Sequence, residues 1–160
     1  MPADRGGLPI TSDFDHVYTT ERLAVTRLAF LIVRSMPVAE DVAQEAFVRL
    51  YERFDTVDNP AAFLRTVAVR MAVLAQRRSD MERQRLTVIG ADQRPGGAPE
   101  VDETWEALGR LRPDRRAVLA LRFYEDLPHD RIAALLGCSA ATVRSRTRRA
   151  LADLRKELDR

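Results

Sequence analysis

Apolar residues recur at helical spacing along almost the whole chain, and no segment alternates apolar and polar residues for long enough to predict a strand. Spacings of three and four residues place apolar side chains on one face of an α-helix, so the chain is predicted to be all-α. Asn59 followed by Pro60 is typical of a helix start, and Pro37 fits the first turn of another helix. The predicted helices cover residues 14–34, 37–54, 60–78, 103–111, 114–124, 130–136 and 140–158.

The segment 79–102 interrupts this pattern. It loses the apolar stripe and gathers Pro95, Gly96, Gly97 and Pro99, which favours a flexible connection over its second half. The sequence contains no internal repeat. We therefore expect two small helical domains on a tether: a tail over 1–13, a three-helix domain over 14–78, a linker over 79–102 and a four-helix domain over 103–160.

Charge is unevenly distributed, although the formal net charge of the 160 residues is only +2. Residues 13–60 hold nine acidic residues and five arginines, a net charge of −4 (5 − 9). Residues 61–85 hold six arginines and two acidic residues, a net charge of +4 (6 − 2). Residues 139–150 hold four arginines and no acidic residue. Attraction to nucleic acid must therefore come from local clusters.

Several classes of protein are disfavoured. The single cysteine, Cys138, cannot form an internal disulfide, and it has no metal-ligand spacing with His16 or His129. The longest apolar run, 28–33, is far shorter than a membrane span, and the first residues lack the apolar core of a signal peptide. We find no nucleophile, metal set or phosphate loop. The sequence thus predicts a cytoplasmic protein that is not an enzyme and needs no cofactor.

Residues 130–158 predict a helix-turn-helix. A short helix is followed by a turn at Gly137 and by Ser139, a good N-cap for the next helix. A helical wheel places the apolar side of that second helix at Val143, Thr147, Ala150, Leu151 and Leu154, and its basic side and flanks at Arg144, Arg146, Arg148 and Arg149. Such a helix suits a DNA major groove. The alternative is a solvated basic face on a surface helix.

The helix predicted over 37–54 has the opposite charge. Its apolar stripe consists of Val42, Ala43, Ala46, Phe47, Leu50, Tyr51 and Phe54. Its other face carries Asp41, Gln44, Glu45, Val48 and Glu52. An exposed valine flanked by acids suits docking onto a basic protein surface. The alternative is an ordinary acidic outer face with one stray apolar residue.

Taken together, three segments resemble a known family. They are AEDVAQEAFVRLY, FDTVDNPAAFLRTVAVRMAVLAQRR and ALGRLRPDRRAVLALRFYEDLPHDRIAALLGCSAATVRSRTRRAL. The chain resembles the sigma factors of bacterial RNA polymerase, in particular the extracytoplasmic-function group, which has conserved regions two and four only. The resemblance covers about residues 14–78 and 103–158.

The resemblance implies roles for particular residues. For binding the clamp helices of the polymerase beta-prime subunit, the candidates are Asp41, Gln44, Glu45 and Val48. For the minus-ten promoter element, they are Asp55, Asn59, Arg65, Arg70, Arg77 and Arg78. For the minus-thirty-five element, they are Arg122, Arg144, Ser145, Arg148 and Arg149. The beta flap of the polymerase and an anti-sigma factor are further implied partners.

The chain departs from the family pattern at a few positions. Phe63 stands where tryptophan is usual, Arg70 stands where asparagine is usual, and Glu125-Asp126 stands where a glycine often precedes the helix-turn-helix. The larger, charged side chain of Arg70 is expected either to alter the base preference at the minus-ten element or to strengthen only a phosphate contact. Trp105 is expected to pack within the second domain. The main alternative function is a free-standing helix-turn-helix regulator that binds an operator without polymerase.

Overall fold

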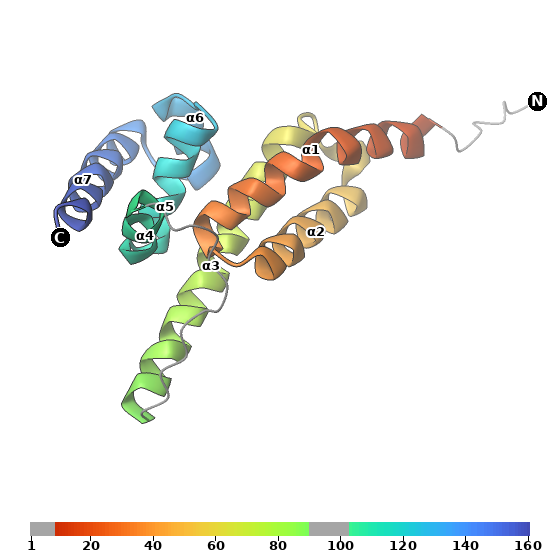
Figure 1. Cartoon of the computed structure of the whole chain (residues 1–160). Helices are drawn as coiled ribbons and strands as arrows, with labels where there is room; N and C mark the ends of the chain where they lie inside the picture. The colour runs from red at the N-terminus through yellow and green to blue at the C-terminus, as the bar shows by residue number, and fades with distance from the viewer. Residues whose placement is uncertain (1–8, 90–102) are drawn as a thin grey trace, which may run out of the picture.

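The computed structural model describes residues 9–89 and 103–160, and in those two ranges the chain forms helices and no strand. The all-α prediction is confirmed for this part of the chain. Figure 1 shows two groups of helices, which we call the first half and the second half. The first half consists of α1 (Pro9–Val33), α2 (Met36–Glu52), the short helix η1 (Phe54–Thr56) and α3 (Pro60–Ile89). The second half consists of α4 (Glu103–Arg110), α5 (Pro113–Leu119), the π-helical turn η2 (Ala120–Tyr124), α6 (His129–Leu136) and α7 (Ala140–Leu158).

The first half is a bundle in which α1, α2 and α3 each pack against the other two. On α2 the buried residues follow the stripe seen in the sequence: Ala39, Val42, Ala43, Ala46, Phe47 and Leu50. Tyr51 was predicted on this stripe, but it is 64 % exposed, and its ring meets the ring of Phe14 edge-on. Periodicity gives the direction of a side chain from the helix axis, but not how far the neighbouring helix extends to cover it.

Two predicted helix starts in this half are confirmed, whereas the start predicted at residue 14 is wrong, because α1 begins at Pro9. Pro37 lies in the first turn of α2. The side-chain oxygen of Asn59 accepts a hydrogen bond from the backbone N–H of Ala62 at 3.1 Å, which caps α3.

The predicted end of the third helix at Arg78 is wrong, because α3 continues to Ile89. Good helix formers continue past Arg78 even though the apolar stripe fades. The Gln76 amide also donates to the Asp80 carboxylate at 2.8 Å, one turn further along. Figure 1 shows the last turns of α3 extending away from the other helices.

The two halves pack against each other, which the tethered-domain prediction did not include. Helix α5 lies against α1 and α3, and α6 lies against α3. One continuous hydrophobic cluster contains buried residues from both halves, among them Leu28, Ile32 and Val69 from the first and Leu121, Ile132 and Val143 from the second. We call this contact the junction.

A buried arginine fastens the junction. Arg116 on α5 is 3 % exposed, and its Nε donates to the backbone carbonyl of Ile32 on α1 at 2.9 Å. Its Nη1 donates to the carbonyl of Leu111 at 2.7 Å. Burial lowers the pKa of Arg116 to about 10, so the guanidinium is still protonated at neutral pH. These bonds satisfy carbonyls that would otherwise be buried without a donor.

An aromatic contact also crosses the junction. Trp105 was expected to pack within the second domain, but its ring stacks on Phe30 of α1, with centroids 5.1 Å apart. The guanidinium of Arg34, just after α1, lies 4.7 Å from the Trp105 ring centroid. Phe30 and Arg34 are distant from Trp105 in sequence, so the periodicity of α4 could not reveal them as its partners.

Candidate nucleic-acid interface

The helix-turn-helix forms as the sequence predicts. Helix α6 ends at Leu136 and is capped by Gly137, whose φ of 65° is left-handed and therefore favours glycine. The hydroxyl of Ser139 then accepts a hydrogen bond from the backbone N–H of Thr142 at 3.1 Å, which starts α7. The two helices pack against each other.

The two sides of α7 differ as predicted, with one exception. Val143, Thr147 and Ala150 are buried. Leu151 was assigned to the same side, but it is 43 % exposed because the neighbouring helices leave that part of α7 uncovered. The predicted minus-thirty-five residues of α7 are exposed or half-buried: Arg144, Arg148 and Arg149 are exposed, and Ser145 is half-buried.

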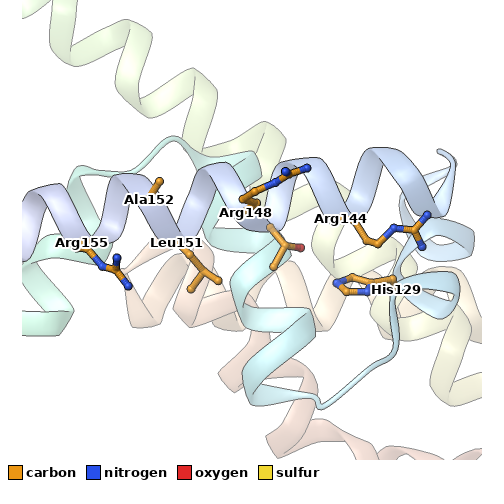
Figure 2. Close-up of a pocket in the computed structure, with 7 residues that line it drawn as sticks. His129, Arg144, Arg148, Leu151, Ala152 and Arg155 are labelled. Atoms are coloured by element: carbon orange, nitrogen blue, oxygen red, sulfur yellow. The ribbon is translucent and has the colours of Figure 1, made fainter.

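A pocket lies along this face of α7. It is lined by His129, Arg144, Thr147, Arg148, Leu151, Ala152 and Arg155. Figure 2 shows Arg144 beside His129 at one end, Arg155 at the other end and Leu151 between them. Three arginines around one open pocket suit the anionic backbone of a nucleic acid. The sequence predicts His129 to be an ordinary polar residue, whereas the structure places it, as the first residue of α6, in the lining of this pocket.

The Arg122 side chain makes two polar contacts within the protein. It is half-buried on η2, and its Nη1 lies 3.5 Å from the carbonyl oxygen of Leu127 and 3.5 Å from the Asp126 carboxylate. Both distances are long for hydrogen bonds to a guanidinium. A phosphate would therefore compete with weak partners at this position.

The acidic face of α2 is on the outside of the bundle. Asp41, Gln44 and Val48 are exposed, and Val48 is 47 % exposed. Glu45 pairs with Arg49 one turn later at 3.0 Å, and both side chains are largely in solvent. An exposed pair of this kind is weak, so it leaves Glu45 able to exchange partners.

The predicted minus-ten residues fall into two groups. Asp55, Arg77 and Arg78 are exposed, on η1 and on α3. The side chain of Asn59 is occupied as the α3 cap. Arg65 and Arg70 instead point to the second half.

Arg65 joins two carboxylates from different halves. Its Nη1 donates to Glu21 of α1 at 2.8 Å, and its Nε donates to Glu125, just after η2, at 2.6 Å. The three side chains are 18 %, 20 % and 9 % exposed, in the order Arg65, Glu21, Glu125. Burial lowers the pKa of the Arg65 guanidinium, but its hydrogen bonds to Glu125 and Glu21 outweigh burial, so its pKa lies above the ordinary value.

The described ranges offer neither a metal site nor a membrane span. Within residues 9–89 and 103–160, no group of histidine, cysteine, aspartate and glutamate side chains is placed to hold a metal ion. No helix in the same ranges is both long and apolar enough to cross a membrane.

Two family models match the chain in the order of its two halves. The model described as Sigma-70 region 2 matches residues 17–81, and the model described as Sigma-70, region 4 matches residues 102–154. The first match covers most of the first half, and the second contains α6, the turn and α7 as far as residue 154.

Relatives of known name agree with these matches. The RNA polymerase sigma-E factor of Streptomyces coelicolor is 31 % identical over 155 residues, which cover 91 % of this chain and 86 % of that protein. A protein of Xanthomonas campestris pv. campestris named "Probable RNA polymerase sigma factor RfaY" is 32 % identical over 160 residues. That match covers 91 % of this chain and 40 % of the Xanthomonas protein, so the chain spans less than half of that relative.

The fold also resembles a solved structure. It is the sigma factor RpoE in a co-crystal with the anti-sigma factor NepR from Bartonella quintana, with a TM-score of 0.72 and 23 % identity. The match covers 92 % of this chain and 98 % of the solved chain. This likeness shows a shared arrangement of helices.

Proposed function

The chain belongs to the sigma-70 family of RNA polymerase sigma factors, in its extracytoplasmic-function group, and we propose on that premise that its two halves bind different partners during initiation. The first half binds core polymerase and the minus-ten element, and the second half binds the minus-thirty-five element. The observation that carries this proposal is the order of the two family matches on two helical units, the first with the acidic face of α2 and the second with the arginine-rich face of α7. The protein acts in the cytoplasm, where the polymerase is.

The polymerase contact is proposed at the acidic face of α2. Asp41, Gln44, Glu45 and Val48 lie on that face, at spacings of three and four residues. An acidic rim around an exposed valine provides both charge complementarity to a basic helix and a small apolar contact at its centre. The beta flap is a second proposed contact on the polymerase.

The minus-thirty-five contact is proposed at α7. Arg144, Arg148 and Arg149 project from its exposed side, and Ser145 and Arg122 complete the set. Arginine can donate two hydrogen bonds to one guanine, and each such pair discriminates by about 1–3 kcal/mol. The rest of the basic surface holds phosphates and sets the register of α7 in the groove.

The minus-ten contact is proposed at η1 and α3. Asp55 and Asn59 lie before and at the start of α3, and the arginines of α3 follow, namely Arg65, Arg70, Arg77 and Arg78. An unstacked base needs polar groups, and the strand that carries it needs a basic surface along its backbone. The chain offers both within one continuous segment.

A regulatory partner is also proposed. The solved sigma factor of similar fold is bound to an anti-sigma factor, and we expect a protein of that kind to bind this chain. A free-standing operator-binding regulator is the weaker reading, because it leaves the match over residues 17–81 and the acidic face of α2 without a role.

The test is run-off transcription with bacterial core polymerase on a promoter library, with and without the protein. Wild-type protein should direct transcription from a subset of promoters, which would also give the consensus. Glu45→Arg should abolish co-purification with core polymerase, because it places a cation against a basic partner. Glu40→Arg is the matched control, since Glu40 is an exposed acid of the same helix outside the proposed set. Equal loss of core binding in both variants, or no association of the wild type, would contradict the proposal.

A further inference from the structure

The junction uses residues that the proposed function assigns to promoter DNA. Arg65 is a proposed minus-ten residue, yet Glu125 of the second half accepts a hydrogen bond from its Nε at 2.6 Å. The Glu125 side chain is 9 % exposed. An ion pair this short and this sheltered is stronger than a surface pair, because solvent and salt screen it less.

The backbone at the end of η2 places Glu125 at the junction. The N–H of Glu125 donates to the carbonyl of Ala120 at 3.0 Å, which closes a π-helical turn. Asp126 then takes a left-handed φ of 51°, and the N–H of Leu127 returns to the carbonyl of Leu121 at 3.0 Å. A π-turn shifts the side chains that follow it relative to an α-helix. Here it turns Glu125 inward and leaves the Asp126 side chain in solvent, 93 % exposed.

A second proposed minus-ten residue touches the helix-turn-helix itself. The Nη2 atom of Arg70 lies 3.5 Å from the carbonyl oxygen of Leu135, in the last turn of α6. A cation at the C-terminal end of a helix is favourably placed even when its hydrogen bond is long. The same Nη2 would lie 3.7 Å from a Cβ placed on Gly137. Arg70 therefore lies against the turn that leads into α7.

This arrangement cannot bind both promoter elements at once. The two elements lie about 25 base pairs apart, which is roughly 85 Å along a duplex that is too stiff to fold back over that length. Gly137 lies beside Arg70. Only seven residues (144 − 137) separate Gly137 from Arg144 of α7 in the sequence. Seven residues reach at most about 25 Å. The structure is therefore a closed state, and promoter binding by both halves requires the junction to open.

We propose that the free protein masks part of its own minus-ten surface, with Glu125 and the C-terminal end of α6 acting as a clasp on Arg65 and Arg70. This inference rests on the proposed function for the role of α3, while the clasp itself is a property of the isolated chain. In the closed state the Nε and Nη1 of Arg65 already donate to Glu125 and Glu21, so a phosphate could form a paired contact with both atoms only by displacing these carboxylates. Binding of α3 to a single strand thus has to compete with Glu125.

The two acids around Arg65 provide a matched pair for the test. Glu125→Gln removes the charge that crosses the junction, whereas Glu21→Gln removes a charge from the same arginine within the first half. Glu125→Lys is a stronger variant, because it places a second cation beside Arg65. The separation of the two halves can be measured by single-molecule energy transfer between two dyes. The dyes are attached to cysteines that replace the exposed residues Glu52 and Lys156, in a protein whose own cysteine is removed by Cys138→Ala.

We expect Glu125→Gln to raise the ratio of open to closed molecules about tenfold and Glu125→Lys about a hundredfold. Glu21→Gln should change it less than about twofold, because its partner lies in the same half. Apparent affinity for a fluorescent random-sequence single strand of roughly 12 nucleotides should rise with the open fraction, since opening releases Arg65 and Arg70 to join Arg77 and Arg78, which are already exposed in the closed state. Circular dichroism and thermal unfolding of each variant check that both halves stay folded.

The outcomes separate the clasp from the proposed function. If neither Glu125 variant opens the molecule more than Glu21→Gln, the clasp is wrong. If the Glu125 variants open it without tighter binding to the single strand, the masking role is wrong. Neither measurement contains polymerase, so failure of the wild type in run-off transcription would overturn the proposed function alone.

Discussion

The arginines of α7 and the arginines at the junction share one type of side chain but have different surroundings. Arg148 and Arg149 are exposed on a helix face without acidic neighbours in residues 139–150. Arg116 is 3 % exposed and donates to backbone carbonyls of both halves, and Arg65 donates to carboxylates of both halves. The arginines of α7 offer their donors to a ligand, whereas Arg116 and Arg65 have committed Nε and Nη1 to contacts within the fold.

The difference shows that local charge in a sequence does not reveal what an arginine binds. Residues 61–85 and residues 139–150 carry similar excess positive charge, and both were interpreted as surfaces for DNA. The structure leaves the second surface exposed, whereas it covers part of the first. The two groups therefore differ in whether their N–H donors are already bonded within the protein. Mutation of the exposed arginines should change transcription, whereas mutation of the buried arginines should change the free energy of unfolding.

The largest expected effect is on the exposed group. Replacement of Arg148 and Arg149 together by alanine should lower promoter-specific transcription by about 100- to 1000-fold, because each arginine contributes about 1–3 kcal/mol at a base or phosphate. Unfolding free energy and core association should be unchanged. The double variant Arg110→Ala with Arg112→Ala removes the same charge elsewhere on the second half and serves as control. A similar loss in that control would show that α7 contributes only net charge.

The next effect is on the buried group. Arg116→Ala should lower the free energy of unfolding by about 2–3 kcal/mol, because it leaves the carbonyls of Ile32 and Leu111 without their donor. The expected fall in Tm is about 5–10 °C for a chain of this size. Arg112→Ala, at an exposed position next to α5, should change Tm by less than about 2 °C. Equal Tm values for the two variants would remove the distinction between the groups.

The smallest effect concerns Arg65, which belongs to the buried group by structure and to the DNA-binding group by proposal. Arg65→Lys keeps the charge but cannot reach both Glu21 and Glu125 in the planar geometry of a guanidinium. We expect a loss of about 1 kcal/mol in unfolding free energy, measured by urea denaturation. Arg70→Lys, at an exposed position with one long contact, should lose less than about 0.5 kcal/mol. Identical losses would place Arg65 with the exposed arginines.

Elements defined by local signals were predicted well. The range 140–158 of α7 agrees with the structure at both ends, because Gly137 supplies a left-handed turn and Ser139 supplies a cap within a few residues of each other. Asn59 and Pro37 mark helix starts for the same reason. These signals act over one or two turns, so the sequence alone is enough to interpret them.

Features that depend on distant partners were not predicted. The ion pair between Arg65 and Glu125, the stack of Trp105 on Phe30 and the buried site of Arg116 all join residues far apart in the chain. The two errors on helix faces, Tyr51 and Leu151, have a related cause. A wheel shows the direction of each side chain, whereas burial depends on where the next helix ends.

The contact between Arg34 and Gly109 has a consequence for natural variation. Arg34 follows α1 with a left-handed φ of 58°, and its guanidinium passes so close to Gly109 that a Cβ there would overlap it. An alanine at 109 would push the guanidinium off the ring of Trp105. A larger residue at 109 therefore requires the flexible end of the Arg34 side chain to move aside, which trades its stacking contact with Trp105 for space at 109.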